Sequence, residues 1–133
     1  MNTHKYGRVA AVGAAVAALS VGGVLTAGPA SASGGVCTVG DHCSGNVTFQ
    51  SKGEIFTIHD YNKDGHGVYG VLEYKGKAGY WNTKVAATNN KGYDASPLVK
   101  NVSIPENRTV RYYVCLSDGD WVFDCSDWYY DHS

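Results

Sequence analysis

The loop at residues 59–67 holds the side chains best suited to chemistry. Asp60, Asn62 and Asp64 occupy alternate positions before a glycine, as in the first half of a calcium-binding loop, where hard oxygen ligands converge on one ion. The second half of that pattern is missing, because Val71 stands where a bidentate glutamate is needed. The same residue types also form hairpin turns. We favour the turn and keep a Ca²⁺ site at Asp60, Asn62 and Asp64 as a hypothesis.

The same loop offers a second chemistry. His59, Asp64 and His66 could bind Zn²⁺ or serve as the acid and base of a metal-dependent hydrolase, because imidazole and carboxylate are common metal ligands and proton carriers. The chain has no nucleophile elbow and no His-Glu-x-x-His motif. Few ionisable groups converge elsewhere. We therefore expect a protein that is not an enzyme and that needs no cofactor other than the hypothetical Ca²⁺.

Aromatic residues are more numerous than a small core needs, with 10 Tyr and 3 Trp. Exposed Tyr and Trp provide a large contact area at low entropic cost, and they stack on sugar rings or anchor protein partners. We expect Trp81 and Trp121 to fill the core. The aromatic residues that we assign to an exposed binding site are Tyr61, Trp128, Tyr129 and Tyr130.

The chain has four cysteines, an even number that predicts disulfides in an oxidising compartment. Of the three connectivities, we favour Cys37–Cys43 with Cys115–Cys125, because each closes a local loop; a pairing that ties the first strand to the last stays open. Each local loop would contribute about 2–3 kcal/mol of stability. The spacings do not match paired zinc knuckles, which argues against a Zn²⁺ site.

Residues 1–32 resemble a secretory signal peptide. Lys5 and Arg8 make the start basic, residues 9–25 are uncharged and apolar, and Ala30 to Ala32 form a small-x-small cleavage signal. A membrane anchor is the alternative, but the stretch is rich in Ala and Gly and only weakly hydrophobic. We expect cleavage before Ser33, a single secreted domain at residues 33–133, and no membrane span after processing.

The charge of the exported part excludes some partners. Loss of Lys5 and Arg8 with the leader leaves 9 basic against 12 acidic residues, a formal charge of −3. Nucleic acids and anionic membranes require a basic patch, whereas the lysines here are scattered singly. We therefore expect no nucleic-acid partner, and we expect a monomer.

Short runs of β-branched and aromatic residues separated by Gly, Asn and Asp are typical of antiparallel strands, and no segment is typical of a helix. The alternation predicts strands at residues 47–50, 54–59, 68–74, 80–88, 98–104, 109–116 and 120–125. About seven strands in about 100 residues predict an all-β fold, a small antiparallel β-sandwich with two disulfides. An open Greek-key barrel is the second choice.

Three features together resemble small secreted actinobacterial proteins of the Streptomyces type. These features are the Ala-rich leader, the sequence DGHG at 64–67, and the strand RYYVCL at 111–116 with Cys125 after it. That group contains disulfides and has no established activity. The resemblance implies export, a β fold and local disulfides, and it carries over no catalytic residue.

These observations favour a secreted, non-enzymatic binding protein of the cell envelope or extracellular space. Its ligand would be an envelope polysaccharide or an extracellular protein, engaged by exposed aromatics and acidic loops. One alternative is an inhibitor or toxin-like protein that presents the disulfide-closed loop at 116–124 to a secreted enzyme or a neighbouring cell. The third is the metal-dependent hydrolase.

Overall fold

The computed structural model describes residues 33–40 and 42–133, so the predicted leader at 1–32 lies outside the described residues. The nine strands are β1 (Ser33–Cys37), β2 (Gly45–Gln50), β3 (Ile55–Asp60), β4 (Gly67–Lys75), β5 (Trp81–Asn89), β6 (Leu98–Asn101), β7 (Thr109–Asp118), β8 (Trp121–Phe123) and β9 (Tyr129–His132). In these two ranges there is no helix that is long and apolar enough to cross a membrane.

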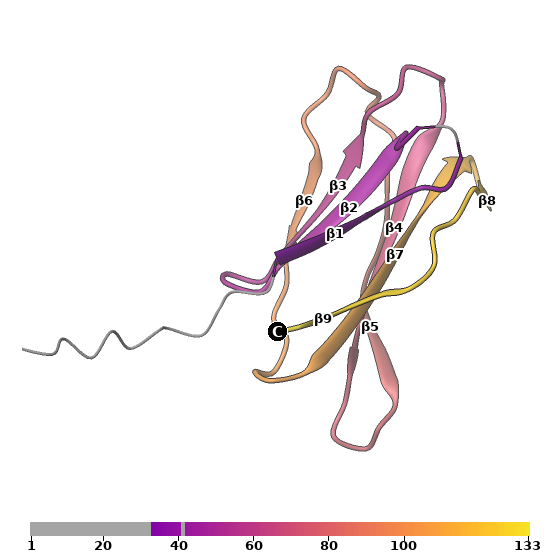
Figure 1. Cartoon of the computed structure of the whole chain (residues 1–133). Coiled ribbons are helices and arrows are strands. Elements are labelled where there is room, and N and C mark those ends of the chain that lie inside the picture. Colours follow the sequence, from indigo (N-terminus) through magenta and orange to yellow (C-terminus); the bar gives the residue numbers. More distant parts are fainter. Residues whose placement is uncertain (1–32, 41) are drawn as a thin grey trace, which may run out of the picture.

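The strands form two antiparallel sheets that pack face to face (Figure 1). The first sheet has the order β1-β2-β3-β6, and the second has the order β5-β4-β7-β8. Strand β9 also pairs with β7 and occupies the edge beside residues 109–112, whereas β8 occupies the edge beside residues 116–118. The predicted all-β sandwich is confirmed.

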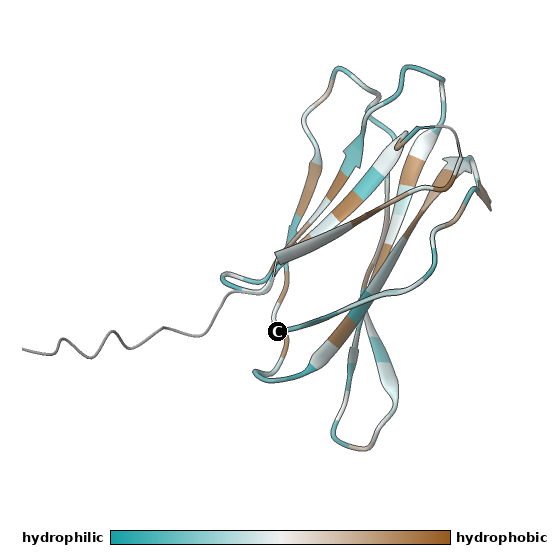
Figure 2. Cartoon of the chain, viewed as in Figure 1, coloured by the Kyte–Doolittle hydropathy of each residue, from teal (hydrophilic) through white to brown (hydrophobic). Residues whose placement is uncertain are grey.

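Alternation along the central strands places one apolar face of each sheet in the core. In β7, Val110, Tyr112 and Val114 are fully buried, as the alternation predicts. The Tyr112 ring centroid lies 6.3 Å from that of Phe49 and 6.0 Å from that of Phe56, both in the opposite sheet. Hydrophobic and hydrophilic bands therefore alternate along β2, β3, β4 and β7 (Figure 2).

Gly70 lets the two sheets approach closely at the centre of β4. A Cβ atom at this position would lie 2.7 Å from Cγ1 of Val47 and 2.9 Å from Cδ1 of Ile58, both in the first sheet. Real Cβ atoms do not approach other carbon atoms so closely. The absence of a side chain at Gly70 is therefore a requirement of the packing between the sheets.

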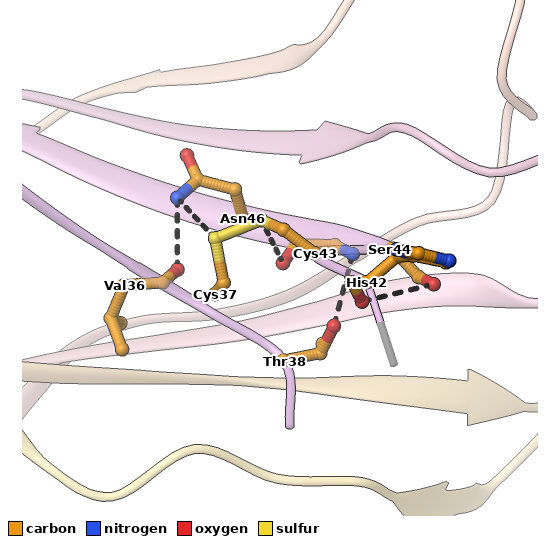
Figure 3. The surroundings of a disulfide bond; sticks show 8 residues. Val36, Cys37, Thr38, His42, Cys43, Ser44 and Asn46 are labelled. Atoms are coloured by element: carbon orange, nitrogen blue, oxygen red, sulfur yellow. Dashed lines mark hydrogen bonds between the residues drawn. A yellow bond between two sulfur atoms is a disulfide. The ribbon is translucent and has the colours of Figure 1, made fainter. Parts of the chain in front are cut away.

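The predicted Cys37–Cys43 disulfide is confirmed. It joins the end of β1 to the residues just before β2, and the Asn46 side chain lies across it (Figure 3). The Nδ2 atom of Asn46 donates a hydrogen bond to the carbonyl oxygen of Val36 at 3.0 Å and lies 3.7 Å from Sγ of Cys37. A disulfide and a side-chain bond thus attach β1 to the sheet at the same point.

The predicted Cys115–Cys125 disulfide is confirmed as well, and it closes the β7–β8 hairpin. The described residues contain no free cysteine. Two disulfides in a small β domain indicate an oxidising, extracellular compartment.

The prediction that Trp81 and Trp121 fill the core is wrong. Trp121 lies on β8 and is 73% exposed. Trp81 would share the inward face of β5 with Val85 in a regular strand, but the pairing with β4 skips Lys84, because Glu73 pairs with Thr83 and Leu72 with Val85. A β-bulge of this kind reverses the facing of every residue beyond it. The bulge therefore turns Trp81 to the outer face.

Candidate functional site

A groove of about 640 Å³ opens at one end of the sandwich. Its walls come from three connections: residues 60–67 between β3 and β4, residues 88–94 after β5, and residues 117–120 between β7 and β8. Figure 1 shows the first two of these connections at the same end of the molecule. The lining side chains that carry a titratable group are Asp60, Lys63, His66, Lys91, Tyr93, Asp94, Asp118 and Asp120.

The β3–β4 loop is held by hydrogen bonds within itself. The Oδ1 atom of Asp60 accepts the backbone N–H of Asn62 at 3.2 Å, and Oδ1 of Asp64 accepts the backbone N–H of His66 at 2.9 Å. These are the short side-chain to backbone bonds by which aspartates form turns. Between them, Gly65 has a φ of 80°, a value that favours glycine. The sequence therefore specifies this turn locally.

The disulfide-closed loop before β2 supports the β3–β4 loop. The backbone N–H of Tyr61 donates to the carbonyl oxygen of Ser44 at 2.8 Å, and Nδ2 of Asn62 donates to Oγ of Ser44 at 3.3 Å. Ser44 directly follows Cys43, so the Cys37–Cys43 link restrains the residue that these two bonds reach. Two hydrogen bonds thus connect the β3–β4 wall of the groove to a loop that the disulfide closes.

The structure does not test the Ca²⁺ hypothesis, but it gives each of its residues another role. Asp60 and Asp64 each use one oxygen in a turn, and Asn62 uses its amide nitrogen on Ser44. Among residues 33–40 and 42–133, no three His, Cys, Asp or Glu side chains gather as a metal site would require. The Ca²⁺ site at Asp60, Asn62 and Asp64 stays a prediction.

Asp60 differs from the other acidic residues of the groove because it is only 8% exposed. Its Oδ1 atom is used by Asn62, whereas its Oδ2 atom is buried and has no hydrogen-bond partner. Burial raises the pKa of the Asp60 carboxyl, the Asn62 N–H opposes this effect, and the charge of Asp64 adds to it. A buried acceptor without a donor is costly in a folded protein. The buried carboxylate of Asp60 therefore reduces the stability of the folded protein.

A smaller recess of about 330 Å³ adjoins the groove and shares Asp60, Tyr93 and Asp94 with it. Its other aromatic wall is Tyr61, whose ring stacks on that of His59 with centroids 5.3 Å apart. Tyr61 is 49% exposed and Tyr93 is 50% exposed. Two half-exposed rings therefore stand beside the Asp60 carboxylate.

The two histidines of the predicted hydrolase site lie in different places. His59 lines the recess, and burial lowers its pKa. His66 lines the groove, where its ring meets the edge of Phe123 with centroids 5.0 Å apart, and its Nδ1 atom is buried without a partner. Asp64 hydrogen-bonds to the backbone of His66 rather than to either imidazole. The arrangement supplies no positioned acid and base pair.

The remaining predicted binding residues lie elsewhere on the molecule. Tyr129 and Tyr130 are exposed as predicted, and they pair through β9 with Tyr112 and Arg111. The groove lies beyond the other end of β7, at Ser117, about 17 Å from Tyr112 at the usual rise per residue. The structure therefore brings Tyr61 to the recess beside the groove, whereas Tyr129 lies against Tyr112 and Tyr130 against Trp81, away from the groove.

Trp128 is partly buried, because it belongs to a stack on the outer face of the second sheet. The guanidinium carbon of Arg111 lies 4.0 Å from the ring centroid of Trp128 and 4.0 Å from that of Trp81. We call these three residues the Trp-Arg stack. The same guanidinium forms an ion pair with Oε2 of Glu73 at 2.7 Å, and Trp128 also meets Tyr113 edge-on at 4.6 Å. Most of the aromatic faces in this stack are already occupied.

The sequence did not indicate that Lys91, Tyr93, Asp94, Asp118 and Asp120, among other residues, line one groove. The local sequence marks both segments as breaks between strands, at 89–92 and at 117–119. It does not show that the two breaks meet at one end of the sandwich, because this depends on the strand order of both sheets.

No protein family, curated protein or solved structure matches the chain. A function can therefore be inferred only from the geometry of the groove and the chemistry of the side chains that line it.

Proposed function

We propose that the protein is a secreted, non-enzymatic binding protein that takes a cell-envelope polysaccharide in the groove at the end of the sandwich. The observation that carries this proposal is the groove itself, in which carboxylates lie beside the half-exposed ring of Tyr93. Its volume of about 640 Å³ falls within the usual range of ligand sites. Its lining is rich in hydrogen-bonding groups, which suits a ligand covered with hydroxyls.

Sugars offer two kinds of contact, and the groove can provide both. Hydroxyl groups donate hydrogen bonds to carboxylates, and here Asp60, Asp94, Asp118 and Asp120 supply acceptors. The C–H faces of a sugar ring pack on aromatic rings, whose rigid surface costs little entropy to present. Tyr93 lines both the groove and the recess, so one ring could contact successive sugar units of a chain.

Export is the second part of the proposal. Residues 1–32 supply the features of a secretory leader, and two disulfides fit a protein that works outside the cell. The ligand would then be a polymer that the exported protein meets at the wall. An acidic domain needs a neutral or cationic polymer, because an anionic one would be repelled by the groove.

The test is co-sedimentation of the purified, oxidised protein with washed, protein-stripped cell walls. Tyr93→Ala should weaken binding about fivefold, because it removes the aromatic surface. The matched control is Tyr80→Ala, which removes a ring that is 76% exposed in the β4–β5 turn and outside the groove. Equal binding by both variants and the parent would remove the groove from the proposal. A Tyr129→Ala variant tests the predicted binding residue on β9 in the same assay.

One observation favours a second candidate, an inhibitor of a secreted enzyme. The Cys115–Cys125 disulfide closes a hairpin that presents Trp121, which is highly exposed, and Val122, which is also exposed. A covalently closed loop with an aromatic anchor loses little entropy when it binds a cleft. Stoichiometric inhibition of a panel of secreted proteases, lost in Trp121→Ala, would establish this candidate, and no inhibition across the panel would remove it.

A further inference from the structure

The β4–β5 hairpin extends beyond the rest of the sandwich. Pairing between β4 and β7 ends at Tyr74, and the next residue, Lys75, pairs with Trp81 of β5. In Figure 1 the turn at residues 76–80 projects from the end of the molecule opposite to the connections that form the groove. The nine residues of β4 separate Gly67, in the groove, from Lys75, a distance of roughly 27 Å at the usual rise per residue. The hairpin therefore ends in a convex tip far from the groove.

This hairpin gathers positive charge that looks scattered along the sequence. Residues 74–84 contain Lys75, Lys77 and Lys84 and no acidic residue, and all three lysines are exposed. None of them forms an ion pair with a described residue. The nearest carboxylate along β4 belongs to Glu73, which is already paired with Arg111 at 2.7 Å. The tip is therefore a cationic region on a domain that is acidic as a whole.

Aromatic rings accompany these lysines on both faces of the hairpin. Nζ of Lys84 lies 5.6 Å from the ring centroid of Tyr74, which packs against the core. On the outer face, Nζ of Lys75 lies 6.0 Å from the ring centroid of Trp81. Tyr80, in the turn itself, is 76% exposed. The tip thus presents one free aromatic ring, with ammonium groups on either side of the hairpin.

Shape and chemistry together select the partner of this tip. Ligands that a protein encloses are held in concave sites, whereas a convex tip fits a surface. Tyrosine is enriched where lipid meets water, and the alkyl part of a lysine can lie along apolar surface while its ammonium stays hydrated. Three lysines neutralise few of the phosphates that a nucleic-acid site contacts. A phosphate polymer offers the same charge as a lipid headgroup but no apolar layer for the Tyr80 ring. A lipid surface with anionic headgroups fits the lysines and the ring at once.

We propose that the β4–β5 hairpin docks the exported protein on an anionic lipid surface, with Tyr80 at the interface and the three lysines beside the headgroups. The contact is peripheral and reversible, since three lysines and one ring give a modest affinity. The acidic groove points away from the surface, because like charges repel. The groove therefore stays open to its own ligand, and the docking does not depend on what that ligand is.

The test is flotation of the oxidised protein with lipid vesicles. The exported form, residues 33–133, is used, because the apolar residues 9–25 of the leader would bind lipid by themselves. We expect the protein to float with vesicles made of equal parts of phosphatidylglycerol and phosphatidylcholine, and to stay behind with phosphatidylcholine alone. Salt at about 0.5 M should release it, since screening shortens the range of the attraction. Binding to both vesicle types, or to neither, would overturn the inference.

Lys77→Gln is the informative variant, because Lys77 lies in the exposed turn and its replacement leaves the pairing of the two strands intact. It should bind the mixed vesicles about fivefold more weakly. The matched control is Lys100→Gln, which removes the same charge from an exposed position on β6 in the other sheet and should keep the parent affinity. Equal losses in the two variants would show attraction of the whole domain to negative charge and would overturn docking by the hairpin.

A measurement on the parent protein tests the orientation. Bicelles of the same two lipids should broaden the backbone amide resonances of Lys77 and Tyr80 before those of Asn62 and Tyr93, and uniform broadening would contradict the docking geometry. Beads that carry poly(glycerol phosphate) test the other source of phosphate, because binding to these beads without binding to vesicles would overturn the lipid assignment. Polysaccharide binding is judged separately by Tyr93→Ala on cell walls, so failure of one proposal leaves the other standing.

Discussion

Replacing Trp128 with alanine should destabilise the protein, although this residue lies near the C-terminus and is only partly buried. Its ring contacts the Arg111 guanidinium at 4.0 Å and the edge of Tyr113 at 4.6 Å. The first contact contributes about 1 kcal/mol and the second about 1 kcal/mol. Burial of about 100 Å² of the ring adds about 2 kcal/mol. Because these contributions overlap, we expect a loss of about 3 kcal/mol in the free energy of unfolding.

The assay is equilibrium urea unfolding of the oxidised protein, followed by circular dichroism. A loss of about 3 kcal/mol lowers the midpoint by about 2 M if the slope is about 1.5 kcal/mol/M. Trp121→Ala is the matched control, because it removes an indole that is exposed over most of its surface and should change stability by less than about 0.5 kcal/mol. Similar losses in the two variants would refute the assignment of Trp128 to the Trp-Arg stack.

A double-mutant cycle isolates the contact itself. Arg111→Ala should also destabilise the protein, because it breaks the ion pair with Glu73 as well as both ring contacts. If the stack is real, the losses of Arg111→Ala and Trp128→Ala should not add, and the coupling should be about 1 kcal/mol. Additive losses would mean that the two side chains act independently.

Three further predictions concern the core, the buried carboxylate and the hairpin. Gly70→Ala should cost about 1–3 kcal/mol in urea unfolding, because its methyl group would collide with the opposite sheet; an unchanged midpoint would contradict the packing argument. Asp60→Asn should be at least as stable as the parent near neutral pH. Burial holds the pKa of the Asp60 carboxyl above its ordinary value, so the folded state binds this proton more tightly than the unfolded chain does. The stability that proton binding contributes is therefore lost as the pH rises through the raised pKa. The difference between variant and parent in urea unfolding should therefore shrink as the pH is lowered through that range, and a difference that grows would contradict this sign. Replacing Cys115 and Cys125 together with serine should lower stability by about 3 kcal/mol, because the loop entropy of the unfolded chain is restored, and thermal unfolding measures it against the parent.

The central strands could be predicted from sequence because their alternation is strong. Strand β1 was missed, since its two adjacent glycines, Gly34 and Gly35, have low β propensity. It forms because β2 pairs with it and because Gly34 lies against the second sheet, where a Cβ atom would meet the Tyr112 hydroxyl at 2.5 Å. Strand β9 was missed because its acidic and aromatic residues suit an exposed tail; it is ordered by pairing with β7. Both strands depend on tertiary contacts that local patterns do not contain.

The candidate site, like the fold, could be predicted only where its structure depends on local sequence. The β3–β4 loop was predicted correctly as a turn rich in Asp and Asn, because its hydrogen bonds run between residues two positions apart. Its proposed function depends on Tyr93 and Asp94, which are about thirty residues away and approach only because β5 returns beside β4. The wrong prediction for Trp81 has the same cause, because one extra residue at Lys84 in the pairing with β4 turns Trp81 outward.

The Trp-Arg stack and the groove differ in how their charged residues are compensated. This difference explains how so small a domain can contain an acidic groove. On the outer face, the Arg111 guanidinium lies between two indole rings and pairs with Glu73. This ion pair stabilises the sheet and leaves little uncompensated charge for a ligand to contact. In the groove, Asp60 is buried without a counter-charge, so it reduces the stability of the free protein. A fold tolerates such a residue when disulfides and a packed outer face supply stability elsewhere. If that is so, Asp60→Asn should raise the free energy of unfolding near neutral pH, whereas Trp128→Ala should lower it without changing the binding to cell walls.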